Sequence, residues 1–122
     1  MENAGRPLTV VVVEDELDLR ELLVFALEVA KLDVHAAASM AEARALLDGH
    51  LRPDVLIADF SLPDGTGADL LALCAAARPT FCMLLTGHDA RDIPAGGFDV
   101  VLTKPVLPEK LVGAIRAHFP GR

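Results

Sequence analysis

Acidic residues follow two apolar runs of the chain, which suggests that they share a site. Glu14 and Asp15 come directly after the run Leu8 to Val13, and Asp59 closes the run Val55 to Asp59. If both runs are strands of one open parallel sheet, their carboxyl ends lie along the same edge, where ligands bind in such folds. The three carboxylates are therefore expected to meet at that edge.

Carboxylates gathered in this way need a positive partner. Two of them about 4 Å apart repel by roughly 4 kcal/mol at an effective dielectric near 20. A hard divalent cation, Mg²⁺ above all, suits oxygen ligands and keeps some of its bound waters. A carboxylate whose charge is balanced can act as a nucleophile, and Asp59 is the candidate.

Five strand-like runs alternate with helical patterns along the chain. Most of the runs are continuously apolar, which indicates strands that are covered on both faces. The alternation of strand and helix predicts right-handed crossovers and a parallel sheet in an α/β fold. The runs are Leu8 to Val13, Val34 to Ala38, Val55 to Asp59, Phe81 to Thr86 and Val100 to Thr103.

Helical periodicity occupies the segments between these runs. The pattern predicts a first helix over about 17–30, a second after the capping box of Ser39 and Glu42, a third over 68–77 and a last one opened by Pro108. Between the third and the last, only 88–93 could be helical before Pro94 interrupts, so the fourth helix should be short. The side of the first helix predicted to face the core carries Leu19, Leu22, Leu23, Ala26, Leu27 and Ala30.

Length and composition limit the classes of function. A chain of 122 residues predicts one domain, with its core over about 8–119 and no output domain. A net charge of −7 with only 11 scattered basic residues argues against direct nucleic-acid binding. No apolar stretch reaches the roughly 18 residues of a membrane span, so a cytoplasmic location is expected. Cys74 and Cys82 lack the neighbours of a metal motif and are predicted to be buried free thiols.

Four motifs together resemble the response-regulator receiver domain of two-component phosphorelays over nearly the whole chain. Glu14 and Asp15 are similar to the acidic pair after the first strand, and Asp59, with the loop Ser61 to Gly65, is similar to the phosphoacceptor segment. Thr86 resembles the hydroxyl position that ends the fourth strand. Lys104-Pro105 resembles the Lys-Pro motif that ends the fifth. Each motif is weak alone, but their order and spacing are specific.

The resemblance implies a flavodoxin-like doubly wound sheet of five parallel strands in the order 2-1-3-4-5. It also implies that the domain takes a phosphoryl group from a histidine kinase or histidine phosphotransfer protein, with Mg²⁺, and signals to a downstream effector protein. By this resemblance, Asp59 is the phosphoacceptor, the metal is bound by Asp15, Asp59 and the backbone carbonyl of Ser61, and Glu14 contacts it through water. Lys104 stabilises charge and forms a cis peptide bond with Pro105. Thr86 donates its hydroxyl, and His88 modulates the lifetime of the phosphoryl group.

One position departs from the family pattern. Most relatives carry Tyr or Phe on the fifth strand three residues before the lysine, and here the residue is Val101. The usual switching and dimerisation mechanism is therefore not carried over. On the first helix, Leu17, Val24 and Phe25 are predicted to point away from the core, where they could bind a helical phosphodonor or simply be scattered surface residues.

Two rival functions remain open at the level of sequence. A pseudo-receiver would have the fold without phosphotransfer, and the complete set of acids, threonine and lysine argues against it. A phosphatase-like enzyme with an aspartate nucleophile would carry a second aspartate two residues later, where this chain has Ser61. The chain is therefore expected to support its own phosphotransfer and autodephosphorylation without being an enzyme on other substrates. Whether it is a stand-alone regulator, a shuttle or sink, or a part of a hybrid histidine kinase is left open.

Overall fold

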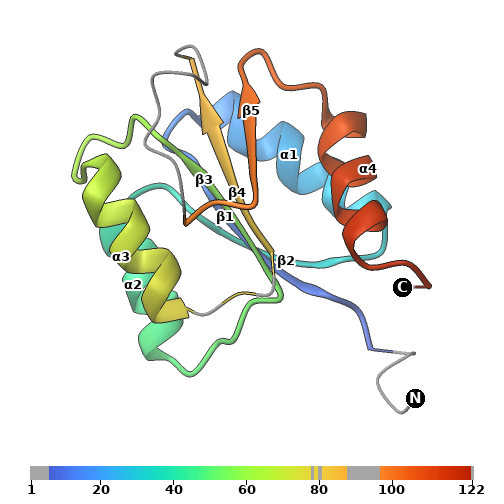
Figure 1. The fold of residues 1–122 in the computed structure, drawn as a ribbon, viewed down its shortest axis with the longest axis horizontal. Coiled ribbons are helices and arrows are strands. Elements are labelled where there is room, and N and C mark those ends of the chain that lie inside the picture. The colour runs from blue at the N-terminus through green and yellow to red at the C-terminus, as the bar shows by residue number, and fades with distance from the viewer. Residues whose placement is uncertain (1–5, 78, 80, 88–96, 122) are drawn as a thin grey trace.

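A computed structural model describes residues 6–77, 79, 81–87 and 97–121. Five strands form one sheet in the order β2-β1-β3-β4-β5, and every neighbouring pair is parallel. This confirms the predicted doubly wound topology, in which β3 is the central strand, between β1 and β4 (Figure 1). The strands are β1 (Thr9–Val13), β2 (Asp33–Ala37), β3 (Val55–Asp59), β4 (Phe81–Thr86) and β5 (Val100–Thr103).

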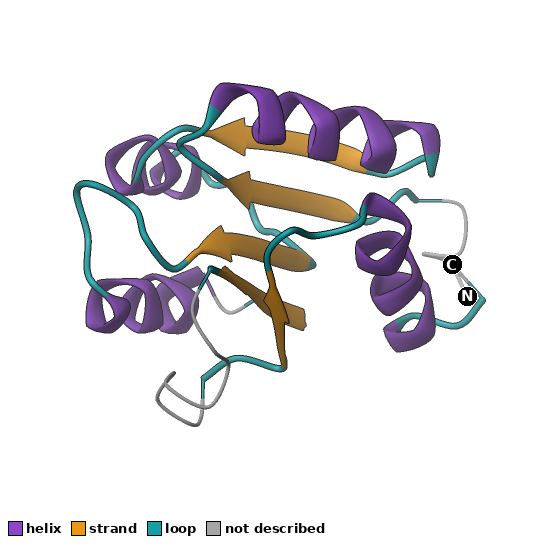
Figure 2. Cartoon of the chain, turned by 90° about the horizontal axis from the view of Figure 1, so that it is seen from above, coloured by secondary structure: helices purple, strands orange, loops and turns teal. Residues whose placement is uncertain are grey.

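Helices cover both faces of the sheet, as Figure 2 shows from above. Helices α1 (Leu17–Val29) and α4 (Pro108–His118) pack on one face, and α2 (Met40–Asp48) and α3 (Gly67–Ala77) pack on the other. The predicted ends of strands and helices agree with the observed ones to within about a residue, the usual uncertainty of a boundary. The expected short fourth helix falls at 88–96, outside the described residues.

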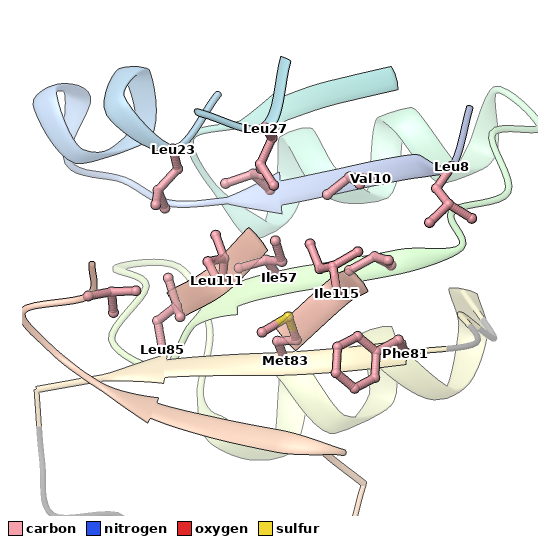
Figure 3. Close-up of a cluster of buried hydrophobic side chains, with 13 residues drawn as sticks. Leu8, Val10, Leu23, Leu27, Ile57, Phe81, Met83, Leu85, Leu111 and Ile115 are labelled. Carbon is pink, nitrogen blue, oxygen red and sulfur yellow. The ribbon is translucent and has the colours of Figure 1, made fainter. Parts of the chain in front are cut away.

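The central strands have continuously apolar runs because helices cover both faces of the sheet. Along β1, Val10 and Val12 point into the cluster beneath α1 and α4, whereas Val11 and Val13 point into the cluster beneath α2 and α3. Successive side chains of a strand alternate between faces, so a strand buried on both sides must be apolar throughout. Figure 3 shows the first cluster, where Leu23 and Leu27 from α1 meet Leu111 and Ile115 from α4 over the central strands.

Side chains cap the helices that follow the strands. The Ser39 hydroxyl accepts a hydrogen bond from the Glu42 N–H at 3.1 Å, and the Glu42 carboxylate accepts one from the Ala38 N–H at 2.8 Å, which confirms the predicted capping box of α2. Thr66 and Asp69 make the same reciprocal arrangement at the start of α3. Pro108 occupies the first turn of α4, as predicted. These three helices therefore begin at positions set by local sequence, whereas α1 has no side-chain hydrogen bond at its N-cap.

One predicted core position on α1 is wrong. Leu22 is 48% exposed, whereas Leu23 and Leu27 are fully buried. The buried stripe of this helix is narrow, because only its centre faces the sheet and α4. Leu22 lies on the edge of the stripe, where helical periodicity alone does not decide between core and surface.

The free thiol predicted at position 82 is also wrong. Cys82 is disulfide-bonded, and the described residues include no free cysteine. Its side chain is buried on β4, in the cluster beneath α2 and α3. Burial correctly predicted a core position, but sequence spacing does not reveal which sulfur lies opposite another. The side chain of Cys74 lies outside the described part of the chain.

None of the helices in the described ranges combines the length and apolarity needed to cross a bilayer.

Candidate functional site at the carboxyl edge of the sheet

The acidic residues meet because their strands end at the same level. In the sheet register, Val13 of β1 lies beside Ala58 of β3, so Glu14 follows its strand at the level of Asp59. On the other side, Asp59 lies beside Leu85. Strand β5 ends beside Thr86, which brings Lys104 to the same edge. The parallel topology thus delivers residues from four strands to one site.

The Lys104 ammonium lies among the acids. Its Nζ is 3.0 Å from Asp59 Oδ2 and 3.3 Å from Glu14 Oε1. The two carboxylate side chains are almost completely buried, whereas the lysine side chain is 26% exposed. A buried charge needs a partner of opposite sign, because the interior solvates it poorly. Lys104 is therefore the internal positive charge that the sequence led us to expect among these acids.

A third carboxylate completes the group. Oxygen atoms of Glu14, Asp15 and Asp59 all lie within 4.8 Å of one another, with Asp15 exposed to solvent. The backbone helps to hold the two buried members, since the Ser61 N–H donates to Asp59 Oδ1 at 3.1 Å and the Glu16 N–H donates to Glu14 Oε2 at 3.1 Å. The cluster thus holds three formal negative charges, and Lys104 contacts two of them, which leaves an excess of negative charge.

Electrostatics at the site shift the pKa values of two groups. Burial raises the pKa of Glu14, and the nearby charge of Asp59 raises it further, against the lowering effects of the Glu16 N–H and of Lys104. Burial by itself lowers the pKa of Lys104, but the hydrogen bond and charge of Asp59, together with Glu14, outweigh it, so the pKa lies above its usual value. The lysine is accordingly held in its charged form.

One oxygen of the cluster lacks a hydrogen bond. Among the described residues, Glu14 Oε1 is buried and makes only the ion contact to Lys104, without hydrogen-bond geometry. Leaving a buried carboxylate oxygen in this state is costly. An added cation beside Glu14, Asp15 and Asp59 would offset both this loss and the mutual repulsion. The donor set, all oxygen, fits a hard divalent ion such as Mg²⁺.

The remaining predicted site residues fall around this cluster. Thr86 is fully buried at the end of β4, and its carbonyl accepts a hydrogen bond from the Lys104 N–H at 2.7 Å. The peptide bond between Lys104 and Pro105 is cis, as the resemblance implied. Ser61 lies next to the acids through its N–H bond to Asp59. His88 lies outside the described residues, so its assignment stays a prediction.

The unusual valine on β5 packs in the core. Val101 lies beside Leu84 in the sheet and is partly buried against the cluster beneath α2 and α3. Phe98 is partly buried against the same cluster. An aromatic ring thus approaches this cluster from a position three residues earlier than Val101.

The apolar residues predicted to face away from the core on α1 do so around a shallow groove. Leu17, Val24 and Phe25 line a groove of about 330 Å³ together with Arg20 and Ala36 of β2, and Glu21 and Glu28 complete its lining. Phe25 is 66% exposed. The groove begins next to the acidic site, because α1 starts two residues after Asp15.

Two contacts with the site loops were missed by sequence reasoning. Arg20 donates to the carbonyl of Glu14 at 3.0 Å, and Asp64 accepts from the N–H groups of Met40 and Ala41 at 3.0 and 3.1 Å. For Arg20 a signal existed, since side chains on the first turn of a helix point back toward its N-terminus. For Asp64 no local signal existed, because its partners lie more than twenty residues earlier.

The fold and the acidic edge define a class of protein. The chain superimposes on the chemotaxis response regulator CheY4 of Vibrio cholerae with a TM-score of 0.77, at 24% identity, over 93% of this chain and 99% of that one. At this identity, the likeness establishes the fold alone. It is the doubly wound five-stranded fold described above, so the chain has a CheY-like α/β fold.

Sequence relatives identify the family. The family model of the response regulator receiver domain matches residues 10–116. The response regulator protein PilR of Pseudomonas aeruginosa is 38% identical over 89% of this chain, and the probable transcriptional regulatory protein TcrX of Mycobacterium tuberculosis is 37% identical over 93%. The chain spans 26% and 50% of the lengths of these two relatives. The chain therefore belongs to the response regulator receiver domain family of two-component systems.

Proposed function

We propose that this receiver domain accepts a phosphoryl group on Asp59 from a phosphohistidine and acts as a phosphorylation-controlled switch, shuttle or sink. The observation that supports the proposal most directly is the position of the Lys104 ammonium, 3.0 Å from Asp59 Oδ2 and 3.3 Å from Glu14 Oε1. A fixed positive charge at this point is suited to the charge that develops on phosphoryl oxygens during transfer.

We propose Mg²⁺ as the cofactor. Asp15, Asp59 and the carbonyl of Ser61 would bind it directly, and Glu14 would contact it through water. Two observations support this assignment: three carboxylates lie within 4.8 Å of one another, and the buried Glu14 Oε1 makes the ion contact to Lys104 but no hydrogen bond among the described residues. When bound, the ion neutralises charge on the phosphoryl oxygens.

In the proposed transfer, Asp59 is the nucleophile, and Lys104 and Thr86 contact the transferred group. A carboxylate oxygen of Asp59 attacks phosphorus, the bond from phosphorus to the donor imidazole nitrogen breaks, and an acyl phosphate forms on Asp59. The Lys104 ammonium keeps its proton and stays beside the new phosphoryl oxygens. The Thr86 hydroxyl donates to one of these oxygens. In autodephosphorylation a water attacks phosphorus, which releases phosphate and restores the Asp59 carboxylate.

The aspartyl phosphate carries about −1.5 to −2 charges at neutral pH. Because it replaces a carboxylate that already carries −1, the edge of the sheet becomes more negative by at most about one charge. Movement of Thr86 toward the new oxygens would shift the conformational equilibrium of the segment that follows β4. The charge added at Asp59 would in this way alter the surface that a partner binds. The output is a downstream effector protein, without direct contact to nucleic acid or membrane, in the cytoplasm. The domain is proposed as a phosphoacceptor and not as an enzyme acting on a separate substrate.

Acetyl phosphate with Mg²⁺ tests the phosphoacceptor, with intact mass as the readout. The native protein should gain one phosphate, Asp59→Asn should gain none, and Lys104→Ala should be labelled much more slowly. Equal labelling of native protein and Asp59→Asn would place the acceptor elsewhere. Absence of labelling and of Mg²⁺ binding in the native protein would favour a pseudo-receiver, and turnover of phosphomonoesters would favour a phosphatase.

The groove on α1 is the proposed contact for a helical phosphodonor, either a histidine kinase or a histidine phosphotransfer protein. Its apolar residues Leu17, Val24 and Phe25 lie along α1, which begins two residues after Asp15. Phe25→Ser should slow transfer from phosphorylated histidine phosphotransfer domains and leave acetyl phosphate labelling unchanged. Val29→Ser is the matched control, because Val29 is 62% exposed on the same helix but does not line the groove. Equal effects of the two variants would contradict this contact.

A further inference from the structure

Arg20 touches the acidic loop from the helix that follows it. Its Nη1 donates to the carbonyl oxygen of Glu14 at 3.0 Å and approaches that of Asp15 at 3.4 Å. Its own N–H donates to the Glu16 carbonyl at 2.9 Å, as part of the first turn of α1. One guanidinium nitrogen thus bridges two consecutive carbonyls of the loop that carries two of the three clustered acids.

These two carbonyls belong to the peptide planes on either side of Asp15. The Glu14 carbonyl lies in the plane that precedes the Asp15 Cα, and the Asp15 carbonyl lies in the plane that follows it. Holding both planes fixes the two backbone dihedral angles of Asp15, and with them the direction of its Cα–Cβ bond. Arg20 therefore constrains the direction in which the Asp15 side chain leaves the main chain.

Asp15 differs from its neighbours in how it is held. The Glu14 side chain is fully buried, and its Oε2 accepts a hydrogen bond from the Glu16 N–H. The Asp59 carboxylate is also buried and is held by the Ser61 N–H and by Lys104. The Asp15 side chain is exposed, and repulsion from the two other carboxylates pushes it toward solvent. Its place in the cluster thus depends on the backbone that carries it.

We propose that Arg20 is a positioning residue for the metal site, which holds the Asp15 carboxylate toward Glu14 and Asp59 through the main chain. The inference rests on the proposed binding of Mg²⁺. Residues that orient metal ligands typically contribute about 10–100-fold to affinity. This role predicts that removing Arg20 weakens Mg²⁺ binding, which is the opposite of what simple electrostatics predicts. If Arg20 acted only as a positive charge near the acids, its removal would strengthen the binding of a cation.

Titration with Mg²⁺, followed by calorimetry and by the amide chemical shifts of the site loops, tests this. Arg20→Ala should weaken Mg²⁺ binding about 10-fold, and Arg20→Lys, which keeps the charge and one donor nitrogen, should have a smaller effect. At saturating Mg²⁺ the maximal rate of labelling by acetyl phosphate should be close to that of the native protein. The loss should therefore appear in the Mg²⁺ requirement and not in the maximal rate.

Arg52 provides the matched control. Its Nη1 also approaches two backbone carbonyls, those of Leu51 at 3.1 Å and Leu47 at 3.5 Å, but it lies before β3, at the opposite end of that strand from Asp59. Arg52→Ala removes the same charge and the same kind of contact, and should leave Mg²⁺ affinity unchanged. Thermal unfolding in EDTA shows whether either variant has lost stability in general.

The outcomes separate this inference from the proposed function. Unchanged or tighter Mg²⁺ binding by Arg20→Ala would overturn the positioning role while native binding still supports the metal site. Equal losses of affinity in Arg20→Ala and Arg52→Ala would also overturn it, since the effect would then be general. A native protein that binds no Mg²⁺ would overturn the proposed metal site and the role of Arg20 together.

Discussion

At the scale of residues, the negative charges of the site are only partly balanced, since it holds three carboxylates and one ammonium. Lys104 contacts two acids, and the third, Asp15, adds a negative charge within 4.8 Å of both. The protein keeps this repulsion although it opposes folding. Functional sites commonly retain such unfavourable arrangements, because the same charges bind the ligand.

The cost of this repulsion can be measured at Asp15. In EDTA, Asp15→Asn should raise the free energy of unfolding by about 1 kcal/mol, because it removes a carboxylate about 5 Å from two others near solvent. In Mg²⁺ the gain should disappear, since the native protein is stabilised by the bound ion and the variant binds it weakly. Urea unfolding in the two buffers measures both effects.

Glu16→Gln serves as the control for this prediction, because Glu16 is an exposed acid of the same loop but does not belong to the cluster. It should change stability little in either buffer. A loss of stability for Asp15→Asn in EDTA would contradict the view that the acids repel one another.

The candidate site could be predicted from the sequence to a large extent at this scale. The acids, Thr86 and Lys104 were identifiable because each ends or follows an apolar run, and parallel strands bring such ends together. The contact of Arg20 had a signal, since side chains on the first turn of a helix point back toward its N-terminus. The contact of Asp64 had none, because its partners are backbone N–H groups more than twenty residues earlier, and backbone atoms are the same in every residue.

At the scale of elements, the loop after β3 is fitted tightly against the start of α2. A Cβ added to Gly65 would lie 2.6 Å from Met40 Cγ, and Met40 is fully buried. Asp64 bonds the first N–H groups of the same helix. The segment that follows the phosphoacceptor is thus held to α2 by packing and by hydrogen bonds.

Gly65→Ala should therefore lower the free energy of unfolding by about 1–3 kcal/mol, because overpacking displaces a buried side chain. Gly113→Ala is the matched control. Nothing lies within 4 Å of a Cβ at position 113, which is exposed within α4, so this variant should gain about 0.5–1 kcal/mol from helix propensity. Chemical unfolding measures both, and equal effects of the two substitutions would refute the close fit at Gly65.

The bonds from Asp64 predict a pH dependence. The Met40 N–H, with the Ala41 N–H, holds the pKa of Asp64 below its usual 3.8. A group whose pKa is lower in the folded state contributes stability above its unfolded pKa and loses it as the pH falls through the folded value. The difference in unfolding free energy between native protein and Asp64→Ala should be constant near neutrality and shrink below about pH 4.

Asp48→Ala is the control for this pH dependence, because Asp48 closes the same helix at its other end. An acid there opposes the helix dipole, so its removal should leave stability unchanged or slightly higher. A difference for Asp64→Ala that persists unchanged to pH 2 would show that the charge of Asp64 does not matter.

The elements themselves were largely predictable. The five strands and the described helices lie where the apolar runs and capping residues indicated, because local propensity and fold agree throughout this chain. Leu22 shows the limit, since the width of a buried stripe depends on the neighbouring helix and not on periodicity.

At the scale of the whole molecule, two apolar clusters lie on opposite faces of one sheet. Ile115 belongs to the cluster beneath α1 and α4, and Leu73 belongs to the one beneath α2 and α3. The central strands contribute side chains to both clusters, so neither layer can form without the sheet. The two clusters should unfold together.

A double-mutant comparison tests this cooperativity. Ile115→Val should cost about 0.5–1.5 kcal/mol and Leu73→Ala about 2–5 kcal/mol. The combined variant should lose the sum to within about 0.5 kcal/mol, because the residues share no contacts across the sheet. Circular dichroism should show one unfolding transition in all variants. Two separate transitions would show that the layers are independent.

The sequence by itself determined the fold class, the strand order implied by the family resemblance and the residue types at the acidic edge. It could do so because strand burial, helix capping and the ends of parallel strands are properties of short segments. Only the tertiary structure decided that Lys104 lies 3.0 Å from Asp59, that Arg20 holds the planes around Asp15 and that Cys82 is disulfide-bonded. These contacts join residues of different elements, or a side chain to the backbone, and their geometry is fixed only when the helices pack on the sheet.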